Sequence, residues 1–487
     1  MGQAAVCNAE HTVEVAGPDN PLPALLTSMG ASPRAERGAA PGAPLPALLT
    51  SGAASPKAEL GLKPQDGGRG AAARRPPGLL ESLAAAGACA WVKEAYLEEV
   101  TVLVSDLSGF TRKTREFGIV HFASVIVRKR QLCLPILHRH GVAHVGTEAD
   151  NLIAVFRDAV SATKAAVEML LTIAAHNSEI PKERAHFRVP LNGVGIHCAK
   201  GLFVDTEGGL HGEAYRTAYH IGEDVADGGR VLITEAVRDR VRADPYFKQA
   251  AFNSFAAEDP ELSLYTVEGE TGPALPAPSH AEGAQFLHPG LLQLARRYDT
   301  PAAELEALDA EIRSSCMCAR TALMFSLDVE AAGSLCEELA AQHRALEALR
   351  PVAKRHSGTM LEDLFWTFTR AADAVAAALD IQATLAELTA SEKAAGRPRA
   401  VLRGCGVHCG QLLFVEGTDA HWGDPANTAS KLGQDLARGG EVLITPQVRE
   451  ATWPEAERLQ LRLSARTLHA SGVDFACFSV KHSKVSL

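Results

Sequence analysis

The chain has 487 residues, of which 46% are hydrophobic and 22% charged, and its formal net charge is −10. This length predicts two or three domains of ordinary globular composition, and the negative charge argues against a nucleic-acid partner. Because no apolar run is long enough for a transmembrane helix and the ten cysteines lack paired spacing, we expect a cytoplasmic protein with free thiols.

The first 78 residues are rich in Ala, Gly and Pro and nearly lack aromatic residues, which predicts a disordered tail. Within this tail, Pro21–Ser28 recurs as Pro44–Ser51. The duplication indicates either a paired docking motif for a protein partner or a low-complexity expansion. Residues 79–98 have apolar residues at helical spacing, so they are expected to form a helix that leads into the first domain.

Two later blocks of sequence each recur about 211 residues further along the chain. The repeated blocks are Gly193–Cys198 with Gly404–Cys409, and Gly212–Asp224 with Gly423–Asp435. The chain is therefore expected to carry two copies of one domain, at 99–270 and 318–480. A linker at 271–317, with a helix near 289–313, is expected between them.

The first copy alternates β-branched runs with helical patterns, which predicts an α/β or α+β domain. The expected strands are 101–105, 142–145, 151–156, 189–197 and 230–233, and the expected helices are 117–139 and 158–176.

Two aspartates of the first copy are expected at neighbouring strand ends. Asp106 ends a buried strand and precedes a small turn at Gly109, and Asp150 immediately precedes the strand at 151–156. Paired carboxylates suit hard divalent cations, which prefer oxygen ligands. A pair of such cations can stabilise both the attacking and the leaving oxygen in phosphoryl transfer.

Two blocks, Asp106–Thr111 (Asp-Leu-Ser-Gly-Phe-Thr) and Gly423–Lys431 (Gly-Asp-Pro-Ala-Asn-Thr-Ala-Ser-Lys), carry a family resemblance. The chain resembles the class III nucleotidyl cyclases, the catalytic domains of adenylate and guanylate cyclases. The resemblance implies two ferredoxin-like α+β domains that pair head to tail, here as an intramolecular pseudo-heterodimer. It also implies an active site in the groove between them, with two metal-binding aspartates from one domain and an asparagine and an arginine from the other.

The resemblance assigns roles to individual residues. Asp106 and Asp150 match the aspartates that hold two Mg²⁺ or Mn²⁺ ions. Asn427 matches the asparagine that orients the ribose, and Lys431 stands where the arginine is usual, which keeps the charge but loses the two-pronged guanidinium. The turn after the first aspartate is expected to offer backbone amides to phosphate. Its residues are Leu107, Ser108, Gly109, Phe110 and Thr111.

The other half of each copy departs from the family pattern. In the first copy, Arg216 stands where the asparagine is expected and His220 where the arginine is expected. In the second copy, Asp328 lacks the following turn, and Glu362 or Asp363 would have to replace the second aspartate. We therefore expect one composite site and one inactive site.

Base preference stays open between ATP and GTP. Family members that use ATP usually carry a lysine and an aspartate at places that hold Gly358 and Ala420 here, and the adjacent Asp419 could substitute only after a loop shift. The expected function is a soluble cyclase that converts a nucleoside triphosphate to the 3′,5′-cyclic nucleotide and pyrophosphate. The alternative is a pseudo-cyclase that binds nucleotide or acts as a scaffold. Pairing of the copies within one chain or between chains also stays open.

Overall fold

The computed structural model describes residues 97–204, 209–257, 262–269, 276–470 and 473–482. The predicted tail and residues 79–96 of the predicted lead-in helix lie outside these ranges. The last two residues of that predicted helix, Leu97 and Glu98, instead begin the first strand.

The first copy contains an eight-stranded sheet with the order β2-β3-β1-β4-β6-β8-β7, and β5 pairs with β4. All pairings are antiparallel except that of β4 with β6. The strands are β1 (Leu97–Leu107), β2 (His144–Glu148), β3 (Asn151–Phe156), β4 (Leu191–Val204), β5 (Gly209–His211), β6 (Arg230–Thr234), β7 (Ala250–Phe255) and β8 (Leu264–Gly269).

Helices cover both faces of this sheet. The core between the sheet and α4, α5 and α7 is the larger one, and α6 packs on the opposite face. Strand β1 is therefore buried on both faces, which explains its nearly continuous apolar run. The helices are α3 (Phe110–Phe117), α4 (Ile119–Arg139), α5 (Ala159–Glu179), α6 (Glu213–His220) and α7 (Glu235–Val241), with short turns η1 (Lys182–Phe187), η2 (Ile221–Val225) and η3 (Pro245–Phe247).

The second copy repeats this plan strand for strand, in the order β10-β11-β9-β12-β14-β16-β15, with β13 on β12. Its strands are β9 (Met317–Glu330), β10 (Thr359–Glu362), β11 (Phe365–Phe368), β12 (Arg399–Phe414), β13 (His421–Trp422), β14 (Glu441–Ile444), β15 (Leu461–Ala470) and β16 (Val473–His482). Its helices are α11 (Leu335–Arg355), α12 (Ala371–Ala394), α13 (Asp424–Ser430), α14 (Pro446–Thr452) and α15 (Ala456–Leu459), with η5 (Lys431–Leu436) and η6 (Trp453–Glu455). The expected mixed α+β class is confirmed.

The glycines shared by the two copies mark a close approach between a helix and the sheet. A Cβ atom on Gly222 would lie 2.6 Å from the carbonyl oxygen of Val104, and one on Gly433 would lie 2.3 Å from that of Met324. Only glycine allows the backbone to come this close. Val104 and Met324 are therefore structural equivalents, and they fix which residues of the two copies correspond.

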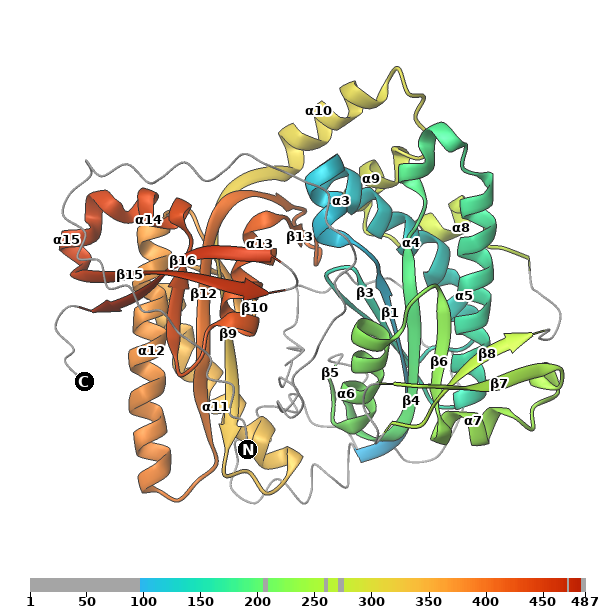
Figure 1. The fold of residues 1–487 in the computed structure, drawn as a ribbon, viewed down its shortest axis with the longest axis horizontal. Coiled ribbons are helices and arrows are strands. Elements are labelled where there is room, and N and C mark those ends of the chain that lie inside the picture. Colours follow the sequence, from blue (N-terminus) through green and yellow to red (C-terminus); the bar gives the residue numbers. More distant parts are fainter. Residues whose placement is uncertain (1–96, 205–208, 258–261, 270–275, 471–472, 483–487) are drawn as a thin grey trace, which may run out of the picture.

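The segment between the copies is helical in pieces, α8 (His280–Ala284), η4 (Pro289–Leu291), α9 (Leu292–Arg296) and α10 (Leu305–Cys316). The predicted helix near 289–313 is thus broken after Arg296. Arg297, directly after α9, forms an ion pair with Asp309 of α10 at 2.6 Å, and this pair holds the end of α9 near α10. Figure 1 shows the two copies side by side, with α10 leading into β9.

Candidate functional site

Asp106 lies next to the end of β1, opposite Gly193 of β4, and its side chain is buried. The chain then turns through Gly109, whose φ of 79° is in the left-handed region, and enters α3. Within the turn, the Ser108 amide already donates to the carbonyl oxygen of Pro190 at 2.8 Å. The Ser108 amide, one of the backbone donors predicted to bind phosphate, is therefore already used within the protein. The first amides of α3 have no intrahelical acceptor.

Asp150 lies in the tight turn between β2 and β3. Because β3 pairs with β1, with Leu152 opposite Ser105, this turn lies at the same edge of the sheet as Asp106. The preceding residue, Ala149, has a φ of 51°, which is uncommon for a residue with a Cβ atom. The sequence prediction that both aspartates meet at adjacent strand ends is therefore matched by the strand register.

Electrostatics single out this pair of carboxyl groups. Burial, followed by the charges of Asp150 and Glu223, raises the pKa of Asp106 to about 8. Burial also raises the pKa of Asp150 to about 6, against the charge of Lys129 and a hydrogen bond with the Asp106 side chain. Crowded acidic groups disfavour the ionised form of each other, and a divalent cation would relieve that repulsion.

The donor set fits a hard cation, because both groups offer only oxygen. In the described part of the chain no three His, Cys, Asp or Glu side chains gather into a metal cluster. A pair of carboxylates is nevertheless what Mg²⁺ commonly takes from protein when substrate phosphates and water complete its shell.

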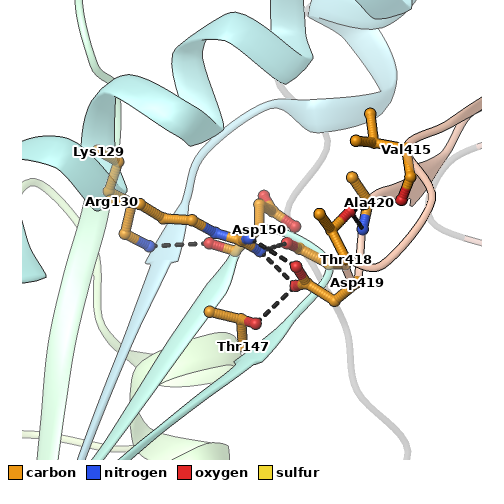
Figure 2. Close-up of polar contacts among 9 residues, drawn as sticks. Lys129, Arg130, Thr147, Asp150, Val415, Thr418, Asp419 and Ala420 are labelled. Carbon is orange, nitrogen blue, oxygen red and sulfur yellow. Dashed lines mark hydrogen bonds and ion pairs between the residues drawn. The ribbon is translucent and has the colours of Figure 1, made fainter. Parts of the chain in front are cut away.

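A buried lysine of α4 braces the same edge from inside. Lys129 donates from Nζ to the carbonyl oxygen of Ser105 at 2.7 Å. It also donates to the carbonyl oxygen of Asp150 at 2.9 Å (Figure 2). It therefore ties together the two chain segments that carry the aspartates and places a positive charge behind them.

The next residue, Arg130, reaches the second copy. Its guanidinium donates to both carboxylate oxygens of Asp419, at 2.8 and 2.7 Å, and Thr147 donates to the same carboxylate at 2.6 Å (Figure 2). Arg130 also donates to the carbonyl oxygen of Ala149 at 3.2 Å. The charge of Arg130 helps to hold the pKa of Asp419 below its usual value although burial opposes this.

Sequence reasoning missed this stretch of α4. Arg128, Lys129 and Arg130 are consecutive, all are buried, and they contact three different parts of the molecule. Arg128 donates to the carbonyl oxygen of Ala295 in α9. A signal was present, because three successive cations inside an otherwise apolar 21-residue helix cannot all lie on one solvent-facing stripe.

The residues predicted for the other half of the site lie on α13 and η5. Asn427 belongs to α13, and Lys431 begins η5. Burial raises the pKa of Glu223, and the charge of Lys431 acts against this rise. Glu223 also accepts a hydrogen bond from Asn151 at 2.7 Å. Asn151 directly follows Asp150, so the charge of Lys431 in the second copy acts close to the Asp150 turn of the first.

The residues of the predicted inactive half lie elsewhere. Arg216 of α6 is within 3.8 Å of Glu338 in α11, so it also contacts the other copy. His220 pairs with Asp224 in its own copy. Neither of these two contacts involves Asp106 or Asp150.

The strand register corrects the first of the two equivalents predicted for the second copy. Asp106 faces Gly193, and the equivalent strand pair places Ser326 opposite Gly404. Ser326, not Asp328, is thus the counterpart of Asp106, because Asp328 lies two residues further along the strand.

The strands that pair with β1 and β9 locate the counterpart of Asp150. Val104 faces Ile153, and its equivalent Met324 faces Phe365, so Ile153 and Phe365 correspond. Asp150 lies three residues before Ile153, and Glu362 lies three residues before Phe365. The register therefore places Glu362, one of the two predicted replacements, at the position of Asp150.

A pair of acidic side chains lies between the copies. Burial, and then the charge of Glu362, raises the pKa of Glu148 to about 8, and Tyr215 donates a hydrogen bond to Glu148 at 3.2 Å. Burial, and then the charge of Asp419, raises the pKa of Glu362 to about 7. Burial and neighbouring negative charge thus shift both carboxyl groups toward the protonated form.

No family model matches the chain. A stretch of 170 residues, 34% of the chain, is 26% identical to the serine/threonine-protein kinase Pkn2 of Myxococcus xanthus, and this match spans a fifth of that protein's length. Among the described residues, no helix has the length and apolarity to cross a membrane.

Solved structures similar to the chain are adenylate and guanylate cyclase domains. The guanylyl cyclase Cya2 is 19% identical with a TM-score of 0.31, covering 38% of this chain and 98% of that one. A bacterial light-regulated adenylyl cyclase is 16% identical with a TM-score of 0.31, covering 35% of this chain and 90% of that one. An adenylate/guanylate cyclase/hydrolase from Silicibacter pomeroyi is 16% identical with a TM-score of 0.27, covering 34% of this chain and 98% of that one.

Proposed function

We propose that the chain is a nucleotidyl cyclase with one composite active site, which converts ATP or GTP to the 3′,5′-cyclic nucleotide and pyrophosphate. In this proposal the two copies pair within the chain as a pseudo-heterodimer. Asp106 and Asp150 come from the first copy, and Asn427 and Lys431 come from the second.

The observation that carries the proposal is the asymmetry of equivalent positions. The first copy has Asp106 where the second has Ser326, and Asp150 where the second has Glu362. The influence of the Lys431 charge on the pKa of Glu223 supports the same pairing, because Glu223 is bonded to Asn151, the residue after Asp150. Two halves that are each incomplete, but complete together, are the arrangement expected of a single composite site.

The proposed mechanism assigns separate tasks to the chain's residues. Asp106 and Asp150 would hold two divalent cations, which when bound supply Lewis-acid activation of the ribose 3′-hydroxyl and charge neutralisation of the triphosphate. Lys431 would stabilise the negative charge that develops on the phosphoryl oxygens. Asn427 would orient the ribose, and the first amides of α3 would contact phosphate because they have no intrahelical acceptor.

A second candidate function is a pseudo-cyclase that binds nucleotide without turnover. Lys431 in place of arginine favours it, because an ammonium cannot make the two parallel hydrogen bonds of a guanidinium. Asp419 favours it as well, since its carboxylate is bonded to Arg130 and Thr147. Ala420 next to it has no polar side chain with which to select a base.

The test is product formation by the full chain with ATP and GTP, in Mg²⁺ and in Mn²⁺. We expect cyclic nucleotide from the wild type, none from Asp106→Ala, and wild-type amounts from Ser326→Ala, the matched change in the other copy. Metal–nucleotide binding without product in any condition would establish the pseudo-cyclase instead. Equal loss in both variants would reject the assignment of Asp106.

A further inference from the structure

The contact between Arg130 and Asp419 is the best-formed ion pair between the two copies among the described residues. The pair has two short hydrogen bonds, and its side chains are only 5% and 25% exposed. Trp422 packs near the guanidinium, 5.2 Å from the ring centre. The ion pair between Arg216 and Glu338, which also joins the copies, is 3.8 Å long, and its arginine is 48% exposed.

On the first copy, this ion pair is fastened to the turn that carries Asp150. Arg130 holds the carbonyl oxygen of Ala149, and Lys129 holds that of Asp150. Thr147 joins from β2. The left-handed conformation of Ala149 costs conformational energy and needs such support from its surroundings.

On the second copy, the ion pair is fastened to the loop that leads into β13 and α13. The Val415 amide donates to the carbonyl oxygen of Ala420 at 3.0 Å, and the Ala420 amide donates to the Thr418 hydroxyl at 3.0 Å (Figure 2). These bonds make the loop a compact turn around Gly417, with Asp419 on its returning arm. The chain continues from this turn into α13, where Asn427 lies.

We propose that Arg130 and Asp419 form a latch of positioning residues, which sets the Asp150 turn of the first copy against α13 of the second. The inference rests on the proposed function and deepens it, since neither residue need touch the substrate. A bidentate guanidinium–carboxylate pair fixes direction as well as distance, and buried ion pairs are better suited to specifying one geometry than to adding stability. A composite site needs that specification, because its two halves belong to separate cores.

The test uses the full chain with Arg130→Met, Asp419→Asn and Arg130→Lys. Arg130→Met and Asp419→Asn are expected to lower kcat by roughly tenfold to a hundredfold, the effect of misplacing reacting groups by about an ångström. The Kd for Mn²⁺ and for nucleotide should change less than about twofold, since the binding groups of each half remain. Arg130→Lys keeps the charge without the two-pronged geometry, so it should rescue kcat only in part. Glu338→Gln, which removes the other ion pair, is the matched control and should keep wild-type kcat.

Hydrogen–deuterium exchange provides a readout that is independent of turnover. Amides of 147–151 and of 415–420 should exchange faster together in Arg130→Met, and at the wild-type rate in Glu338→Gln. Unchanged exchange in either segment, or unchanged kcat despite faster exchange, would overturn the latch. If the wild type makes no product, the proposed function fails, and paired acceleration of exchange in the two segments alone decides whether the latch exists.

Discussion

The two copies share a backbone plan but differ at the strand ends. The first copy places Asp106 and Asp150 at the edge where β1 ends and β3 begins, and the second places Ser326 and Glu362 at the same positions. The glycines that let the helix approach the sheet are kept in both. Packing requirements therefore constrain each copy separately, whereas the carboxylate at the position of Asp106 is present in only one of them.

The largest effect should separate Asp150 from its counterpart Glu362. Asp150→Asn removes one of the two charges proposed to bind cations, and product formation should fall by about a hundredfold or more, as for loss of a central electrostatic group. Glu362→Gln removes the carboxyl group at the equivalent position of the second copy and should retain activity. Cyclic nucleotide assays on both variants check this, and similar losses in the two would remove the functional contrast between the copies.

A smaller but clear effect is expected on stability at Lys129. Lys129→Met leaves the carbonyl oxygens of Ser105 and Asp150 without their buried donor. The free energy of unfolding should drop by roughly 1–3 kcal/mol, the range for leaving a buried hydrogen-bond acceptor without its donor. Lys164→Met is the control, because its partly exposed ion pair with Asp244 contributes about 1 kcal/mol or less. Urea titration measures both, and equal changes would contradict the bracing role of Lys129.

The shared glycines should behave alike in the two copies. Gly222→Ala and Gly433→Ala each push a methyl group against a backbone carbonyl oxygen that cannot move aside. Each should lower the free energy of unfolding by roughly 1–3 kcal/mol, as overpacking does. Gly146→Ala, whose added Cβ would be 3.8 Å from its nearest neighbour, is the control. A marked difference between the two glycine variants in thermal unfolding would show that the copies tolerate crowding differently.

The smallest expected effect is a pH dependence of the free energy of unfolding, caused by Glu148 and Glu362 between the copies. The folded pKa of Glu148 is about 8 and that of Glu362 about 7, both above the usual 4.5. The folded chain thus binds more protons than the unfolded chain in this range, so this contribution to stability is lost as pH rises from about 4.5 to 8.

Glu148→Gln should flatten this dependence, because the amide cannot ionise. Denaturant unfolding at several pH values measures the slope, with Glu213→Gln, an exposed acid, as the control. A wild-type slope that persists in Glu148→Gln would assign the pH dependence to other groups.

The sequence by itself determined the duplication, the α+β class and the strands that carry Asp106 and Asp150. These follow from local patterns: β-branched runs, repeated glycines, and a polar residue at the end of an apolar strand. The helices around 117–139 and 158–176 were also predictable, because their apolar spacing is regular.

Only the tertiary structure decided which residues correspond between the copies. Counting along the chain pointed to Asp328, and the pairing of β9 with β12 assigned Ser326 instead, since a shift of two residues cannot be seen without the partner strand. The contacts of Lys129 and Arg130 were equally hidden, because they join α4 to segments distant in sequence. Local sequence patterns indicate which face of a helix or strand is buried. They do not indicate that a buried Lys129 will bond to the Asp150 turn, or a buried Arg130 to Asp419, because these partners are distant in sequence.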